Sequence, residues 1–365
     1  MPVDPLDRRH MTRALELAAR GLWTTDPNPR VGCVLADGER VVAEGWHERA
    51  GGPHAEAMAL AAAGVRARGS TAYVTLEPCC HHGRTPPCAD ALVAAGVGRV
   101  VYAMRDPNPR VSGGGIGRLE AAHIACEGGV MEQASRELNP GFISRMERGR
   151  PWVVVKLAAS LDGGTALPGG ASRWITGEAA REDVQRLRAR SSAVMTGSGT
   201  VLSDDPRLDV RLPGATRQPL RVVLDSQLRI SPTARIVAPP GKLLVLCTTP
   251  SPERANALRA AGAEVVTVAA GDAGVELSAA LALLAGREIN ELLAECGAGL
   301  AGALLSAGLV DELLLYLAPT LLGTEARPLV NLPTPATMAD RLEFSIAGQQ
   351  DVGGDLLIRL RPRRR

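Results

Sequence analysis

The sequence is poor in aromatic residues and lysine, and it contains no long uninterrupted hydrophobic run. Trp, Tyr and Phe make up 2% of its 365 residues, which leaves few rings for stacking against nucleobases. The longest apolar segment, Gly299 to Pro319, contains Asp311 and Glu312, so we expect no membrane-spanning helix. A net charge of +2 does not indicate a polyanion-binding surface. We therefore predict a soluble globular protein that binds neither nucleic acid nor membranes.

The sequence also lacks the marks of a secreted, disulfide-bonded protein. Its first residues do not show the basic and then apolar pattern of a signal peptide. The seven cysteines are odd in number and scattered, which favours reduced thiols, some of them metal ligands. We therefore expect a cytoplasmic protein. The arginine-rich end, RLRPRRR, is predicted to be a frayed, solvated terminus.

The first part of the chain has the pattern of a layered α/β sheet. Asp37-Gly38 lies between two apolar runs and indicates a hairpin turn. Helices and strands alternate after this hairpin. The predicted helices are 7–20, 55–63 and 87–95, and the predicted strands are 30–36, 40–45, 71–76 and 99–104.

A domain boundary is predicted in the polar stretch NPGFISRMERGRP, Asn139 to Pro151, just before the strand pattern PWVVVKLA. We assign 1–147 to the first domain and 148–365 to the second. Alternation resumes after the boundary and predicts a second, separate α/β sheet. Its predicted strands are 152–158, 193–196, 220–225, 242–247, 264–268, 291–295 and 312–317, and its helices centre on 183–190, 253–261, 275–284 and 300–307.

The stretches GGPHAEAMAL and LEPCCHHGRTPPC carry the residues of a candidate metal site. His54 and Glu56 form a His-x-Glu pair at the start of an apolar helix, and Cys79 and Cys88 follow. This set resembles the zinc-dependent nucleobase deaminase signature, which assigns His54, Cys79 and Cys88 to zinc and leaves Glu56 free. Three protein ligands leave a fourth position for water, whose pKa zinc lowers to about 7. We expect Glu56 to accept the water proton and pass it to the leaving ammonia.

Two prolines near the cysteines suggest why their thiolates are stabilised, and the spacing of the cysteines leaves other ligand sets open. Pro78 and Pro87 suit the first position of a helical turn, which would place both cysteines at positive helix ends. Eight residues separate Cys79 from Cys88, where the common signature has two, so a Cys79–His82 pair is a rival arrangement. A structural zinc with four strong ligands is the alternative without chemistry.

Longer sequence stretches in both predicted domains resemble one particular enzyme family. TTDPNPRVGCV, GWHERAGGPHAEAMAL, TAYVTLEPCCHHGRTPPCADAL, KLAASLDG, SRWITG, GTVLSDDPRLDVR and AECGAGLAGALL closely resemble the bifunctional riboflavin-biosynthesis deaminase/reductase family over nearly the whole chain. The resemblance implies an α/β fold, with a cytidine-deaminase-like three-layer α/β/α domain followed by a dihydrofolate-reductase-like α/β domain. It implies deamination of 2,5-diamino-6-ribosylamino-4(3H)-pyrimidinone 5′-phosphate and then NADPH-dependent reduction of its ribosyl group to ribityl. We also expect a homo-oligomer, either a dimer or a tetramer.

The same resemblance assigns binding residues in both domains. It places the deaminase substrate near Asn28, His47, His81 and Arg84. It places NADPH near Ala158, Trp174, Thr200, Asp204, Ser226 and the run Gly297, Ala298, Gly299, Leu300, Ala301, Gly302, Ala303. It places the ribotide of the reduction near Ser172, Arg188, Leu208, Arg211 and Glu295. Arg188 and Arg211 suit a phosphate because a guanidinium binds it in a bidentate manner.

Three features of the second domain follow from the residues themselves. Gly297 to Gly302 spells GxGxxG, but no acid ends the next strand, so we predict an anion site at a helix N-terminus without Rossmann topology. Lys156 lies in an apolar strand, where an unpaired ammonium is costly, so it either has a partner or serves the site as a substrate ligand. Asp204 either caps a turn or delivers the proton that opens the sugar ring during reduction.

Two other functions fit part of the pattern. One is a nucleoside, nucleotide or tRNA deaminase whose C-terminal domain is unrelated to a reductase. The other is a zinc-stabilised binding module without catalysis.

Overall fold

The computed structural model describes residues 4–80, 87–109, 111–215, 217–272 and 274–363. The chain divides into two compact units, Met1–Arg150 and Pro151–Arg365. Each unit has its own sheet and its own core, and each is described by itself. No helix within the described ranges is long and apolar enough to span a membrane.

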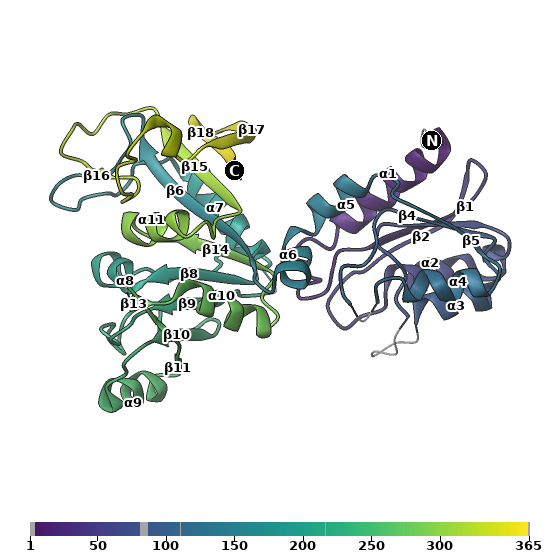
Figure 1. Cartoon of the computed structure of the whole chain (residues 1–365), viewed down its shortest axis with the longest axis horizontal. Helices are drawn as coiled ribbons and strands as arrows, with labels where there is room; N and C mark the ends of the chain where they lie inside the picture. Colours follow the sequence, from purple (N-terminus) through teal and green to yellow (C-terminus); the bar gives the residue numbers. More distant parts are fainter. Residues whose placement is uncertain (1–3, 81–86, 110, 216, 273, 364–365) are drawn as a thin grey trace. The chain divides into compact units, whose positions relative to one another are not determined.

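The first unit is a three-layer α/β/α sandwich, which confirms the predicted fold class (Figure 1). Its sheet has the order β2-β1-β3-β4-β5, with β1 antiparallel to both neighbours and β3, β4 and β5 parallel. The strands are β1 (Gly32–Asp37), β2 (Arg40–Trp46), β3 (Thr71–Val74), β4 (Arg99–Tyr102) and β5 (Ala125–Gly128). Helices α1 (Pro5–Ala19) and α5 (Glu132–Leu138) lie on one face, and α2 (Ala55–Ala63), α3 (Cys88–Ala95) and α4 (Gly114–Ala121) on the other. The short helix η1 (Gly64–Ala67) follows α2, and α6 (Pro140–Arg148) ends the unit.

Strand β1 is buried on both faces, which is why its sequence is almost continuously apolar. Cys33 and Leu35 contact the cluster under α2, α3 and α4, whereas Val34 and Ala36 contact α1. A glycine then brings α2 close to the sheet. A Cβ on Gly45 would lie 2.4 Å from the Ala55 carbonyl oxygen, so only glycine permits this approach of the helix that carries Glu56.

The second unit is built on a nine-stranded sheet with the order β11-β10-β9-β8-β14-β6-β15-β18-β17. All neighbouring strands are parallel except β18, which runs antiparallel to β15 and β17. The strands are β6 (Trp152–Ser160), β8 (Ala193–Gly197), β9 (Leu220–Leu224), β10 (Leu243–Cys247), β11 (Glu264–Thr267), β14 (Glu291–Glu295), β15 (Glu312–Ala318), β17 (Phe344–Val352) and β18 (Asp355–Pro362). Two small ribbons pair β7 (Gly164–Ala166) with β16 (Arg327–Pro328) and β12 (Ala270–Gly271) with β13 (Gly274–Val275).

Helices cover both faces of this sheet. Helices α10 (Leu277–Gly286) and α11 (Ala298–Ser306) pack on one face, and α7 (Glu178–Arg190) and α9 (Pro252–Ala260) on the other. Helix α8 (Ser198–Asp204) follows β8, and η2 (Met338–Asp340) precedes the last hairpin. The strand order turns back around β14 and β6, and ligands of such sheets bind beyond the carboxyl ends of the strands at that point. Glu295 ends β14 there.

Several local predictions were wrong. Residues 359–362 of the arginine-rich segment are not frayed, because they belong to β18, where Arg359 pairs with Glu312 at 3.1 Å. The predicted helices also omit α6, which lies in the stretch of the predicted boundary. The hairpin turn begins one residue later than predicted, since Asp37 is paired with Arg40 and Gly38 takes a φ of 55° in the turn.

Gly302 offers a direct test of packing in the second unit. A Cβ at this position would lie 1.9 Å from the Asn331 carbonyl oxygen, and the Asn331 N–H donates to the Ala298 oxygen at 3.0 Å. We expect Gly302→Ala to lower the free energy of unfolding of this unit by about 1–3 kcal/mol, because the backbone at Asn331 must move. Thermal or denaturant unfolding measures the effect. Gly286→Ala, at a helical glycine with no atom within 4 Å of an added Cβ, is the matched control and should not destabilise.

Candidate active sites

The three predicted zinc ligands meet in the first unit. His54 is the N-cap of α2, Cys88 is the first residue of α3, and Cys79 lies in the segment after β3. Their donor atoms all lie within 4.8 Å of one another, with His54 Nδ1 3.3 Å from Cys88 Sγ and 3.5 Å from Cys79 Sγ. A tetrahedral zinc with bonds of about 2.0–2.3 Å separates its donors by roughly 3.4–3.8 Å. The donor set and its spacing therefore fit a zinc ion.

The electrostatics of the cluster favour a thiolate beside a proton-carrying carboxylate. Hydrogen bonds from Cys88 and His54 lower the pKa of Cys79 to about 4, although burial acts against them. The Cys88 backbone N–H also donates to Cys79 Sγ at 3.3 Å. Glu56, in the first turn of α2, is 3% exposed, and burial together with the negative charge of Cys79 raises its pKa to about 7. Glu56 is thus able to exchange a proton near neutral pH.

The two prolines do not have the predicted role. Pro87 is the N-cap of α3 rather than its first helical residue, which puts Cys88 at the helix start. Pro78 begins no helix, because residues 77–80 have no regular secondary structure. Cys79 therefore gains its stabilisation from the Cys88 amide and from His54 rather than from a helix end of its own.

Two predicted substrate residues lie next to the metal ligands. His47 is 2% exposed and its ring packs edge-on against His54, with the centroids 5.6 Å apart. His47 Nδ1 donates to the Pro53 carbonyl oxygen at 2.9 Å, so in the neutral ring Nε2 accepts from the Asn28 amide at 3.1 Å. Burial lowers the pKa of His47 and favours this neutral form. The predicted substrate ligands His81 and Arg84, and the rival zinc ligand His82, lie outside the described residues.

Sequence reasoning missed Glu77, which is buried two residues before the ligand Cys79. Its carboxylate accepts four backbone N–H groups, from Asp106 (3.3 Å), Gly113 (3.1 Å), Gly115 (3.2 Å) and Ile116 (3.4 Å). It thereby caps α4, whose N-cap, Gly113, has no side chain to do so. An acid directly before Pro-Cys is the only sequence signal of this role. Glu77 fixes the segment from which Cys79 extends.

In the second unit, the structure brings three predicted substrate residues together. Lys156 and Glu295 are register partners on the adjacent strands β6 and β14. Arg188 on α7 donates to both carboxylate oxygens of Glu295, at 2.5 and 2.8 Å, and to the Asp209 carbonyl oxygen at 3.1 Å. Burial alone would raise the pKa of Glu295, but Arg188 and Lys156 hold it below its usual value. The bidentate face of Arg188, predicted to bind phosphate, is thus occupied by a carboxylate.

The remaining predicted ribotide residues are more dispersed. Arg211 is half exposed and forms an ion pair with the buried carboxylate of Asp209, so it stays accessible to a phosphate. The Leu208 side chain is buried in the core, so only the backbone of this residue could contact a ligand. Its φ is 53°. Ser172 is half-buried in the segment between β7 and α7.

Part of the predicted cofactor site is also assembled. The Gly297 N–H, at the start of α11, donates to the Thr200 hydroxyl of α8 at 3.2 Å. Trp174 is 69% exposed, with the Arg181 guanidinium 4.6 Å from its ring centroid. Ala158 and Ser226 are half-buried on β6 and just after β9. Asp204 is exposed as the last residue of α8 and does not cap a turn through any hydrogen bond recorded within the described ranges.

The glycine-rich run contributes only in part. Gly297 and Gly299 are exposed and Ala298 and Leu300 are half-buried, whereas Ala301 is fully buried and Gly302 packs on the Asn331 backbone. Ala303 is half-buried further along the helix. The backbone of residues 297–300 is therefore the part that a phosphate can reach.

Together, a three-layer sandwich with a His-Cys-Cys site and a mixed sheet with a glycine-led helix after β14 define a zinc-dependent deaminase joined to a reductase. The comparisons with known proteins agree. Residues 5–104 match the family model of the cytidine and deoxycytidylate deaminase zinc-binding region, and residues 151–358 match that of the RibD C-terminal domain. The second match overturns the alternative of a C-terminal domain unrelated to a reductase.

Full-length relatives make the assignment specific. The riboflavin biosynthesis protein RibD of Escherichia coli K12 is 48% identical, over 97% of this chain and 99% of the relative. Acinetobacter baumannii RibD, form 1, a solved structure, is 44% identical in sequence and aligns with a TM-score of 0.91 over 98% of this chain and 99% of that one. A deaminase/reductase of Thermotoga maritima, 33% identical, aligns with a TM-score of 0.85 over 98% and 99% of the two chains.

The chain belongs to the RibD family, the bifunctional deaminase/reductases of riboflavin biosynthesis. Zn²⁺ in the first unit and NADPH in the second are consistent with these matches and with the donor set. The chain is accordingly an enzyme that acts on a small molecule, and the alternative of a non-catalytic binding module is wrong.

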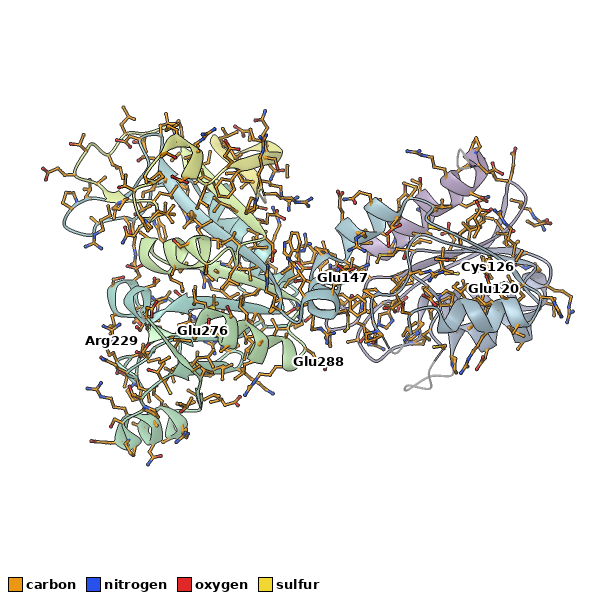
Figure 2. All side chains as sticks on the ribbon, viewed as in Figure 1. Glu120, Cys126, Glu147, Arg229, Glu276 and Glu288 are labelled. Carbon is orange, nitrogen blue, oxygen red and sulfur yellow. The ribbon has the colours of Figure 1, made fainter. Side chains whose placement is uncertain are left out.

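Glu77 can be tested through the metal. In Glu77→Gln one acceptor oxygen becomes an NH₂ group that faces backbone N–H donors, so the segment carrying Cys79 should shift. We expect a loss of roughly 10- to 100-fold in zinc affinity, measured by competition with a chromophoric chelator. Glu120→Gln, at an exposed carboxylate on α4 (Figure 2), is the control and should bind zinc as the parent does. Equal zinc affinity in both variants would show that Glu77 does not support the site.

Proposed function

We propose that the first unit deaminates 2,5-diamino-6-ribosylamino-4(3H)-pyrimidinone 5′-phosphate and that the second then reduces its ribosyl group to ribityl with NADPH. The observation that carries the proposal is the three-donor cluster with the buried Glu56 beside it. Support for the substrate comes from the Thermotoga maritima relative, which is named a diaminohydroxyphosphoribosylaminopyrimidine deaminase and 5-amino-6-(5-phosphoribosylamino)uracil reductase.

In the deaminase, His54, Cys79 and Cys88 would hold zinc. When bound, zinc supplies a Lewis acid that activates water for attack on the amino-bearing carbon. Glu56 accepts a proton and returns it to the amino group that leaves as ammonia, a role suited to a carboxyl whose pKa is about 7. The neutral His47 would fix the Asn28 amide, whose oxygen and second N–H would orient the pyrimidine edge.

In the reductase, NADPH supplies a hydride to C1′ of the ribosyl group, which must first open to an imine-like form. Opening needs an acid, and we propose Asp204 rather than Glu295, because Arg188 keeps the Glu295 carboxylate anionic. Arg211 would hold the phosphate of the ribotide, and the Lys156 ammonium would donate to an acceptor on the base. Ala158, Trp174, Thr200, Ser226 and residues 297–303 would hold NADPH, with residues 297–300 facing its phosphates.

The organisation of the enzyme is part of the same proposal. We place the deaminase domain at 1–147 and the reductase domain at 148–365, and expect a homodimer or homotetramer. A cytoplasmic location is supported by the seven cysteines, none of which forms a disulfide within the described residues.

The role of Glu56 is tested by Glu56→Gln. This variant keeps the size of the side chain but cannot transfer the proton, so we expect ammonia release from the diamino-pyrimidinone ribotide to fall by at least about 100-fold. Bound zinc, measured by metal analysis, should stay at the parent level. Glu48→Gln, at an exposed carboxylate, serves as the control. If Glu56→Gln released ammonia at the parent rate, the proposed proton transfer by Glu56 would be wrong.

Metal removal separates the two activities. The donor cluster lies wholly in the first unit, so dialysis against a chelator should abolish ammonia release and leave reduction of separately prepared, deaminated ribotide unchanged. Reduction is followed as loss of nicotinamide absorbance, and added Zn²⁺ should restore deamination. Ammonia release that persists in metal-free enzyme would contradict the proposed deaminase.

A further inference from the structure

Lys156 is a cation inside the second unit that has no anionic partner in contact. It is half-buried on β6, and burial lowers its pKa despite the negative charge of Glu295. Within the described ranges, no group forms a hydrogen bond or an ion pair with Lys156 Nζ. Such an ammonium is costly unless another interaction stabilises it or a ligand completes its surroundings. Of the two alternatives that the sequence left for Lys156, a permanent ionic partner is therefore not found among the described residues.

The contact that Lys156 does make is with an aromatic ring. Its Nζ lies 5.6 Å from the ring centroid of Tyr316, within the range of a cation–π interaction. Tyr316 is on the adjacent strand β15 and has no exposed surface. This interaction uses none of the three N–H donors of the ammonium, so they stay available to a substrate.

The ring is itself held in place from α7. The Tyr316 hydroxyl donates to Asp183 Oδ2 at 2.5 Å, and Ala180 and Val184 of the same helix pack in the cluster that contains the ring. One helix turn further along α7, Arg188 fixes Glu295, the register partner of Lys156. Helix α7 therefore orients both neighbours of the ammonium, the ring through Asp183 and the carboxylate through Arg188.

We propose that Tyr316 is a positioning residue of the reductase, which holds the Lys156 ammonium by its ring and is held by Asp183, so that the N–H donors of the ammonium stay available to the pyrimidine ribotide. The inference rests on the proposed function of Lys156 as a ribotide ligand. It adds two residues, Tyr316 and Asp183, that act through Lys156 and do not touch the substrate.

The test uses the full-length enzyme with bound zinc and deaminated ribotide as substrate. Tyr316→Leu removes the ring, and we expect KM for the ribotide to rise roughly 3- to 30-fold with a smaller change in KM for NADPH. Tyr316→Phe keeps the ring and should recover most of the loss. Leu357→Ala is the matched structural control, because Leu357 lies in the same cluster and pairs with Tyr316 across β18. It should lower the melting temperature without changing KM for the ribotide.

A double-mutant cycle then shows whether Tyr316 acts through Lys156. Lys156→Met removes the charge, so adding Tyr316→Leu to it should raise KM little further. Additive effects of the two substitutions, or an unchanged KM in Tyr316→Leu, would overturn the inference. The proposed function fails differently, since it is contradicted if the unaltered enzyme does not oxidise NADPH with this ribotide or if Lys156→Met alone leaves KM unchanged.

Discussion

The fold of the first unit is organised around one constraint, that an imidazole and two sulfur atoms from three separate segments must meet at one point. Two of these segments begin helices that pack on the same face of the sheet, and the third follows the central strand β3. The close approach of α2 at Gly45 and the cap that Glu77 provides for α4 both serve this meeting point. Three donors converge among the described residues, and a zinc ion held by these three alone would keep a position for water next to Glu56.

The second unit handles charge in a different way. Its active end contains a buried carboxylate, a guanidinium and an ammonium, and no metal ligands are needed to keep them there. Arg188 and Glu295 neutralise each other in an ion pair. The Lys156 ammonium contacts the Tyr316 ring, and this contact uses none of its N–H donors. Buried ion pairs add little net stability, which is in keeping with the role in substrate binding proposed for this arrangement.

The sequence was sufficient to predict features that local motifs encode. It was insufficient for features that depend on contacts between distant segments. The His-x-Glu pair and the two cysteines belong to short motifs that predicted the zinc ligands. The alternation of helices and strands predicted both sheets. The C-terminal hairpin was missed because its arginines resembled a charged tail, although Arg359 pairs with Glu312 of β15. The role of Glu77 depends on amides 29 to 39 residues away. The sequence left open whether Lys156 has a partner, which only the fold decides.

The most direct measurement is X-ray absorption at the zinc edge of the fully loaded enzyme. The structure predicts a first shell of two sulfur atoms at about 2.3 Å and two lighter atoms at about 2.0–2.1 Å, one from the imidazole of His54 and one from an exchangeable water. A shell of three or four sulfur atoms, or one with two imidazole nitrogens and no exchangeable ligand, would contradict an open catalytic site.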